Sequence, residues 1–162
     1  MDFTGKIALI TGGGNGIGRA AALAFAKRGA KVVVVDKDGA AAKGTADTIL
    51  QQKGDALPVT ADVAKSADVQ AYVKAALDKY GRIDCFFNNA GIEGKVAPIV
   101  DYDEAMFDAV IGINLKGVAP AGKLEASGTW NGMVSHRVRV ESAAEFNKEI
   151  MLWLKQAYDH AG

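Results

Sequence analysis

Short apolar runs alternate with segments of helical periodicity from the start of the chain to about residue 118. The apolar runs are rich in β-branched residues and nearly unbroken, which is typical of strands buried on both faces. Repeated strand–helix order predicts an α/β fold with a mostly parallel sheet, because parallel neighbours need a crossover helix between them. The expected strands are residues 7–10, 31–36, 56–61 and 82–87, and the expected helices are residues 19–28, 39–53, 66–80 and 101–117.

Residues 133–140 have a different pattern, in which apolar and polar side chains alternate. Such alternation predicts a strand with one wet face, and we expect it to join the sheet beside the fourth strand, in a direction that the sequence leaves open. A capping box at Ser142–Glu145 then begins a final amphipathic helix. The whole pattern predicts a Rossmann-like doubly wound fold, whose mostly parallel five-stranded sheet has central order 3-2-1-4 and helices on both faces.

A glycine-rich turn, Thr11–Gly18, joins the first expected strand directly to the first helix. The first backbone N–H groups of a helix have no partner within the helix, and the helix dipole favours an anion beside them. Gly12 permits the tight turn, Gly16 lets the backbone approach a pyrophosphate, and Gly18 lets the helix pack against the strand. A flexible surface loop is the plain alternative, but the position between strand and helix favours a phosphate site.

The second expected strand ends at Asp36, 18 residues beyond Gly18. A carboxylate at this distance would accept hydrogen bonds from both hydroxyls of an adenine ribose and would repel a 2′-phosphate. The implied cofactor is therefore NAD rather than NADP, although the neighbouring Lys37 weakens that inference. The alternative is an ordinary strand-end aspartate that caps the following helix.

Composition indicates a globular protein and excludes several classes. The 162 residues suit one domain, and 49% of them are hydrophobic while 23% are charged. The 19 basic and 19 acidic side chains cancel, so bulk charge attracts neither nucleic acid nor an anionic membrane. No secretory signal or membrane span is expected, and the single Cys85 cannot form an internal disulfide, which agrees with a cytoplasmic location.

Residues 1 to about 118 resemble the first half of a short-chain dehydrogenase/reductase. The resemblance is carried, in chain order, by Thr11-Gly12-x-x-x-Gly16-Ile17-Gly18, Asp36, Asp62-Val63, Asn88-Asn89-Ala90-Gly91 and Ile113-Asn114-Leu115-Lys116-Gly117. These resemble the family's cofactor fingerprint, NAD-selecting acid, adenine-contacting pair, sheet-stabilising tetrapeptide and active-site asparagine segment. The implied cofactor-binding residues are Gly12, Gly14, Asn15, Gly16, Ile17, Gly18, Asp36, Asp62, Val63, Asn88, Ala90 and Gly91, and the implied catalytic residue is Asn114.

The resemblance also implies general acid–base catalysis by a Tyr-x-x-x-Lys pair, with a serine that orients the substrate oxygen. The lysine ammonium must lie one turn from the tyrosine to lower its pKa. No tyrosine of this chain has a lysine four positions later, since the residues after Tyr72, Tyr80, Tyr102 and Tyr158 at that spacing are Ala76, Asp84, Met106 and Gly162. Asn114 therefore stands without its partners, and a polar residue on an apolar helix is its plain alternative.

Residues 119–132 gather Pro, Gly and Ser after a helix, which predicts a linker between the dinucleotide-binding half, residues 1–118, and a divergent strand–helix tail, residues 133–162. We expect one truncated or chimeric domain, joined naturally or by engineering. Loss of the last strands and helices of a larger fold would uncover apolar surface, so a homo-oligomer is expected.

Two functions of different classes remain. The favoured one is a binding module that holds NAD or NADH without hydride transfer, because losing a positioned general acid costs roughly 10²–10⁴ in rate. The alternative is an NAD-dependent oxidoreductase whose acid comes from the tail, where Ser135, His136 and Tyr158 are candidates. His136 and His160 have no cysteines or clustered carboxylates at metal-ligand spacing, so no metal site is expected.

Overall fold

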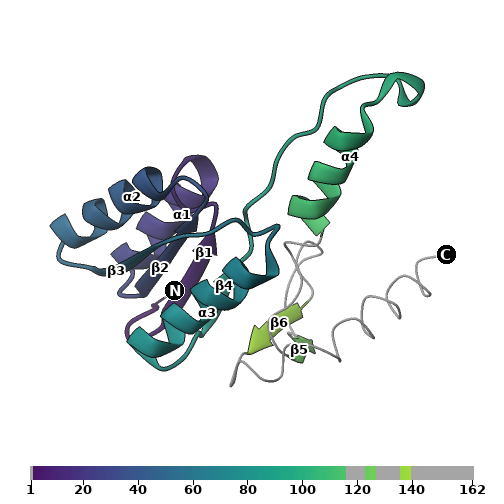
Figure 1. The fold of residues 1–162 in the computed structure, drawn as a ribbon. Coiled ribbons are helices and arrows are strands. Elements are labelled where there is room, and N and C mark those ends of the chain that lie inside the picture. The colour runs from purple at the N-terminus through teal and green to yellow at the C-terminus, as the bar shows by residue number, and fades with distance from the viewer. Residues whose placement is uncertain (1, 116–122, 127–135, 140–162) are drawn as a thin grey trace.

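A parallel sheet forms the centre of the computed structural model, which describes residues 2–115, 123–126 and 136–139. The sheet has four strands in the order β3-β2-β1-β4, and every pairing in it is parallel (Figure 1). This confirms the predicted central order. The strands are β1 (Ile7–Thr11), β2 (Lys31–Asp36), β3 (Asp55–Thr60) and β4 (Cys85–Phe87).

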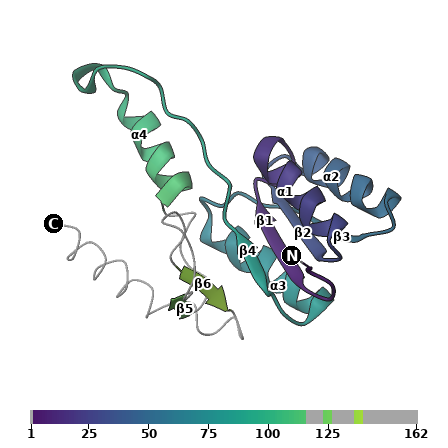
Figure 2. The same ribbon diagram turned by 180° about the vertical axis from the view of Figure 1, so that it is seen from behind.

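Helices cover both faces of this sheet, as the unbroken apolar strands predicted. Two of them, α1 (Gly16–Lys27) and α2 (Gly39–Gln51), lie on one face, and α3 (Ser66–Tyr80) lies on the other (Figure 2). Alternate residues of each strand therefore enter two separate cores. The central part of β2, residues 32–35, is completely buried, because its side chains meet α1 and α2 on one side and α3 on the other.

Local capping explains where two helices begin or end. The Asp38 carboxylate accepts hydrogen bonds from the backbone N–H groups of Ala40 and Ala41 and so begins α2. At the other end of α3, Gly81 adopts the left-handed conformation (φ 78°) that commonly stops a helix. The predicted helices at 39–53 and 66–80 therefore agree with the structure to within two residues at each end.

The segment after β4 is more divided than predicted. In place of one helix over residues 101–117, the structure has a 3₁₀ turn, η1 (Ile99–Asp101), then α4 (Glu104–Val110), and a π-helical turn, η2 (Ile111–Leu115). Asp103 caps α4 by accepting a hydrogen bond from Met106 N. In Figures 1 and 2, α4 extends away from the sheet. Residues 116 and 117 of the predicted helix lie outside the described residues.

The predicted fifth strand does form, but it does not join the parallel sheet beside the fourth strand, so this part of the prediction was wrong. Residues 136–139 make β6 (His136–Arg139), which pairs antiparallel with β5 (Lys123–Ala126) in a separate two-stranded sheet. The described parallel sheet thus has four strands and not five. Alternation reveals that a segment is a strand with one wet face, but it does not reveal the partner. β5 also falls within the predicted linker, and the predicted last helix lies outside the described residues.

Among the described residues, no helix combines the length and the hydropathy needed to cross a bilayer.

Lys53 has an unusual backbone for a residue with a side chain. It follows the carboxyl end of α2 with φ 62°, a conformation in which Cβ crowds the backbone. Replacement by glycine removes this crowding and is expected to raise stability by about 0.5–1 kcal/mol net of the entropic cost of glycine. We expect Lys53→Gly to raise Tm by roughly 2 °C in thermal denaturation. The control Lys53→Ala keeps Cβ and should give no rise, so an equal gain from alanine would contradict this account.

Candidate functional site

The carboxyl ends of β1, β2 and β4 lie together at one edge of the sheet, because the strands are parallel and adjacent. From β1 the chain order runs outward through β2 to β3 and then returns to β4 on the other side of β1. In open α/β sheets, ligands bind outside the carboxyl ends of the strands at such a reversal. The glycine turn, Asp36 and the tetrapeptide Asn88–Gly91 all begin at this edge.

The glycine turn leads from β1 straight into α1. Gly12 (φ 63°) and Gly16 (φ 52°) both have the left-handed backbone that residues with a side chain avoid. Asn15 is the N-cap residue of α1, yet its side chain makes no capping hydrogen bond, and the first turn of α1 contains no acidic residue. The helix start is therefore not occupied by an acid of its own, and Asn15, Gly16 and Ile17 are exposed there. This geometry suits an anionic ligand.

The inner side of the same turn has no spare room. A Cβ at Gly18 would overlap the carbonyl of Gly12 and lie 2.7 Å from Asn89 Nδ2. A Cβ at Gly12 would lie 3.0 Å from Ala90 Cα. The turn is therefore packed against β4's carboxyl end on one side and open to solvent at residues 15–17 on the other.

The buried hydroxyl of Thr11 joins the end of β1 to the residues that follow β4. It donates a hydrogen bond to Asn88 Oδ1 (3.0 Å) and accepts hydrogen bonds from the backbone N–H groups of Asn89 and Ala90 (3.1 Å each). The Asn89 amide in turn donates to the carbonyls of Thr11 (3.1 Å) and Gly12 (3.4 Å). Thr11 and Asn89 were not among the predicted site residues, although both stand inside the motifs that the sequence analysis singled out.

The Asp36 carboxylate is aimed at the glycine turn. Its Oδ2 accepts a hydrogen bond from Gly14 N (2.8 Å), and its Oδ1 accepts one from Asp38 N (3.0 Å). The cap of α2 is Asp38, so the alternative that Asp36 caps this helix is wrong. Because each carboxylate oxygen has two lone pairs, Asp36 keeps acceptor capacity for hydroxyl groups of a ligand.

The predicted pair Asp62-Val63 divides between the surface and the core. Asp62 Oδ2 forms an ion pair with Lys37 Nζ (3.2 Å), and its Oδ1 accepts a hydrogen bond from Ala64 N (3.1 Å). The hydrogen bond from Ala64 lowers the pKa of Asp62, and Lys37 and Lys65 lower it further against the opposing effect of burial. Val63 packs into the core against α3. Asp62 is therefore the member of the pair with polar atoms near the site edge.

Asn114 lies in the π-helical turn and bonds to the backbone after the tetrapeptide. Its Oδ1 accepts a hydrogen bond from Ile92 N, and its Nδ2 donates one to Ile92 O, both at 2.9 Å. A Cβ at Gly91 would lie 3.3 Å from Asn114 Oδ1, which shows how closely the two segments approach. The side-chain amide of Asn114 thus holds the chain at Gly91–Ile92.

Neither of the two tyrosines of α3, the buried Tyr72 and the partly buried Tyr80, has the properties of a proton donor at this edge. Burial raises the pKa of Tyr72 to about 12. The pKa of Tyr80 is also raised, mainly by burial and then by its hydrogen bond to Asp55 (2.9 Å) and the charge of that carboxylate. Asp55 begins β3, so Tyr80 lies at the opposite end of the sheet from the glycine turn. A catalytic tyrosine requires the reverse, a lowered pKa beside the reacting oxygen.

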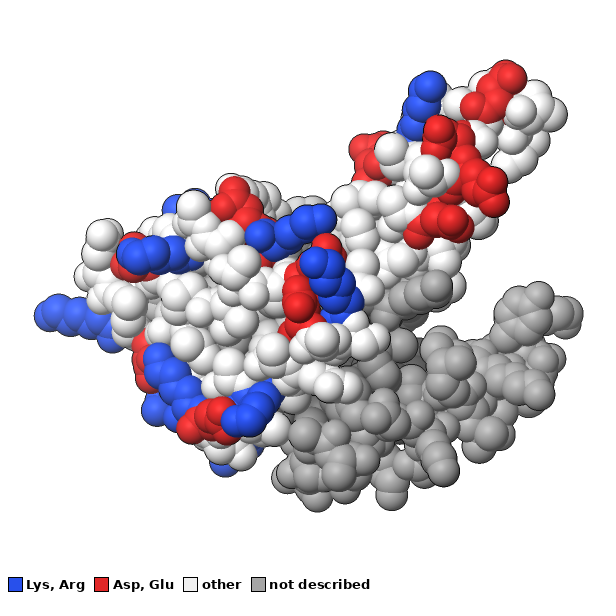
Figure 3. Space-filling view, viewed as in Figure 1, with Lys and Arg blue, Asp and Glu red and all other residues white. Residues whose placement is uncertain are grey.

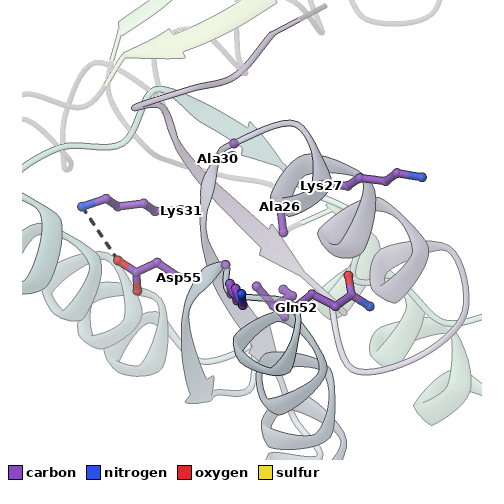
Figure 4. A pocket seen from close by; sticks show the side chains of 10 residues that line it. Ala26, Lys27, Ala30, Lys31, Gln52 and Asp55 are labelled. Carbon is purple, nitrogen blue, oxygen red and sulfur yellow. Dashed lines mark ion pairs between the residues drawn. The ribbon is translucent and has the colours of Figure 1, made fainter.

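A cavity of about 440 Å³ lies at that opposite end of the sheet (Figure 4). It is bordered by the carboxyl ends of α1 and α2 and by the first residues of β2 and β3. Lys31 points toward Asp55, at an Nζ–Oδ2 distance of 3.8 Å, whereas Lys27 extends away (Figure 4). Lysines attract anions while helix carboxyl ends repel them, so the walls favour no single ligand charge. The cavity contains none of the predicted site residues.

Across residues 2–115, 123–126 and 136–139, no group of three or more His, Cys, Asp and Glu side chains could hold a metal ion. Ser135 and Tyr158, two of the candidate acids, lie outside the described residues, and His136 begins β6.

The chain belongs to the short-chain dehydrogenase family, since the family model described as short chain dehydrogenase matches residues 6–143. Its fold is the family's dinucleotide-binding fold. This agrees with the glycine turn, the site edge and the strand order described above. The match continues past residue 118, where the sequence analysis placed the end of the resemblance.

Individual relatives match about three quarters of the chain. Levodione reductase from Leifsonia aquatica is 48% identical over 118 residues, which are 72% of this chain and 44% of the relative. A short chain dehydrogenase/reductase from Aspergillus oryzae is 41% identical over 120 residues, 74% of this chain and 46% of the relative. The chain therefore spans less than half the length of these relatives.

A solved structure of a 3-ketoacyl-(acyl-carrier-protein) reductase from Brucella melitensis, complexed with NADH, superposes with a TM-score of 0.68 at 48% identity. It covers 72% of this chain, and the match covers 47% of that chain. The crystal structure of levodione reductase gives a TM-score of 0.69 at 46% identity over 72% of this chain and 46% of its own.

The packing at Gly18 can be tested by adding a single methyl group. Gly18→Ala places Cβ against the carbonyl of Gly12, so the turn must open, at an expected cost of about 3 kcal/mol or more in the free energy of unfolding. The matched control is Gly44→Ala on α2, where a Cβ meets nothing within 4 Å. Alanine at position 44 should raise the free energy of unfolding by about 0.5–1 kcal/mol. Denaturant unfolding measures both, and similar effects at the two positions would refute this packing.

Proposed function

We propose that this member of the family is an NAD(H)-binding module without a complete catalytic site. The observation that carries the proposal is the combination of an open α1 start with the Asp36 carboxylate fixed beside it by Gly14 N. The free N–H groups at a helix start suit a pyrophosphate, which is an anion, and a carboxylate at the end of β2 suits the two hydroxyls of a ribose. The proposed cofactor-binding residues are those of the sequence analysis, with Thr11 and Asn89 as the residues that hold the turn in place.

NAD is proposed over NADP on electrostatic grounds. A 2′-phosphate on the adenine ribose would lie against the Asp36 carboxylate, whose negative charge repels it. Lys37, the neighbouring cation, forms its ion pair with Asp62 instead. The opposing influence that the sequence analysis gave to Lys37 is thereby reduced.

The proposal that the catalytic site is incomplete rests on the residues that the family resemblance implies for catalysis. The chain has no Tyr-x-x-x-Lys pair. Burial raises the pKa values of Tyr72 and Tyr80, and the Asn114 amide already bonds to Ile92. A bound nicotinamide would therefore have no positioned acid from the described residues. A join between a dinucleotide-binding half and a divergent tail, natural or engineered, accounts for this combination.

The second candidate function is an NAD-dependent oxidoreductase that draws its acid from the tail. Two observations favour it: membership of a dehydrogenase family, and the closeness of β6, which begins at His136, to β4. Strand β4 leads directly into the tetrapeptide at the site edge. A residue of the tail could in this way stand near a nicotinamide.

We also propose that the protein forms homo-oligomers in a reducing, cytoplasmic setting. The segment around α4 exposes several large apolar side chains, among them Val96, Ile99 and Val100, which are 94%, 85% and 86% exposed. Acidic side chains gather over the same part of the molecule (Figure 3). Apolar surface of this kind favours burial against another copy. The single cysteine of the chain agrees with a reducing compartment.

Binding and turnover together test the function. Purified protein titrated with NADH, followed by nicotinamide fluorescence, should bind it more tightly than NADPH. Asp36→Ala should lower the affinity for NADH by about 10- to 100-fold, because hydrogen bonds to a charged group are lost. The control Asp47→Ala removes an exposed carboxylate on α2 and should leave affinity unchanged. Absence of NADH binding by the unmodified protein would overturn the proposal.

A panel of ketones and aldehydes with NADH separates the two candidate functions. Binding without oxidation of NADH is the expected result. Turnover that His136→Ala abolishes would favour the oxidoreductase and contradict the incomplete site.

The oligomer can be tested at η1. Val100→Lys places a charge on the exposed apolar segment and should lower the mass measured by light scattering after gel filtration. Ala71→Lys, an exposed position on α3, is the control and should leave the mass unchanged. A monomeric unmodified protein would refute the oligomer.

A further inference from the structure

Gly14 is held from two directions by groups outside the glycine turn. Its N–H donates to Asp36 Oδ2 (2.8 Å), and its carbonyl accepts a hydrogen bond from the hydroxyl of Thr45 on α2 (3.0 Å). Thr45 is only 1% exposed, so water cannot readily replace its hydroxyl. The bond joins residues 31 positions apart in the chain.

The helix α2 packs directly onto the turn at this point. A Cβ at Gly14 would lie 2.7 Å from Ala41 Cβ and 2.8 Å from Asp36 Oδ2. Ala41 and Thr45 are four residues apart and so lie on the same face of α2. Thr45 is therefore the one polar group of this close-packed face that bonds to the turn.

The Gly14 carbonyl belongs to the peptide that connects Gly14 to Asn15, the N-cap residue of α1. In a planar trans peptide the C=O and N–H groups point in opposite directions. With its carbonyl bound to Thr45, this peptide directs Asn15 N–H away from α2. Glycine has the conformational freedom to let that peptide rotate if the bond is lost.

We propose that Thr45 is a positioning residue of the dinucleotide site, an inference that rests on the proposed function. Its hydroxyl fixes the peptide between Gly14 and Asn15, which leads into α1, and by holding Gly14 it also orients the Gly14 N–H that donates to the Asp36 carboxylate. Without the hydroxyl, the buried Gly14 carbonyl has lost its partner and the turn shifts to regain one. Both phosphate and ribose binding then depend on a side chain that touches neither.

The experiment compares Thr45→Val, which has nearly the same shape but no hydroxyl, with Thr45→Ser, which keeps the hydroxyl. The matched control is Thr48→Val on the same helix, where the hydroxyl donates to Gly44 O within α2 (2.8 Å). Each variant of the 162-residue chain is titrated with NADH and with NADPH, at a temperature well below its own unfolding midpoint. Circular dichroism establishes that each variant is folded.

Thr45→Val should lower the affinity for NADH by about tenfold, which is the effect of leaving a buried acceptor without its partner. The affinity for NADPH should fall less, because the contact between Asp36 and the ribose contributes only to the binding of NADH. Thr45→Ser and Thr48→Val should bind as the unmodified protein does. If Thr45→Val does not fold, Thr45→Ala takes its place with the same expected results.

Two results would overturn the inference while leaving the proposed function intact. One is unchanged NADH affinity in Thr45→Val. The other is an equal loss for NADH and NADPH, which general loosening of α2 would produce. An unmodified protein that binds no NADH fails at the earlier step and overturns the proposed function itself.

Discussion

The hydrogen bonds of the Thr11 hydroxyl are the interaction on which the site depends. This one buried group connects the end of β1 to Asn88, Asn89 and Ala90 beyond β4. The crevice of a doubly wound sheet lies between those two strands, because the chain order reverses there. Thr11 therefore sets the distance between the glycine turn and the tetrapeptide.

The glycine turn combines a crowded inner side with an open outer side. Gly12, Gly14 and Gly18 pack against Asn89, α2 and the turn's own backbone, so none has room for a side chain. Residues 15–17, by contrast, are exposed to solvent. A rigid inner side holds the helix start in one place, and this is what an anion site requires if its affinity is not to be lost in ordering the loop.

The elements of the described chain are buried to different degrees. Helices α1, α2 and α3 bury both sides of β1 and β2, which are the best packed elements of the described chain. In contrast, no residue of α4 is buried. The chain spans less than half the length of the relatives described above, and the site edge is formed by the well-packed strands.

The sequence by itself determined the elements of residues 7–87, their order and the edge at which the motifs meet. These depend on local periodicity, on turn residues and on the rule that parallel strands need crossover helices. Only the tertiary structure decided which aspartate caps α2, which strand pairs with β6, and that Asn114 bonds to Ile92. It also brought Thr45 to Gly14. The reason is that local pattern specifies a residue's face and conformation, whereas a polar group's partner is chosen among several chemically equivalent ones by packing over long distances in the chain.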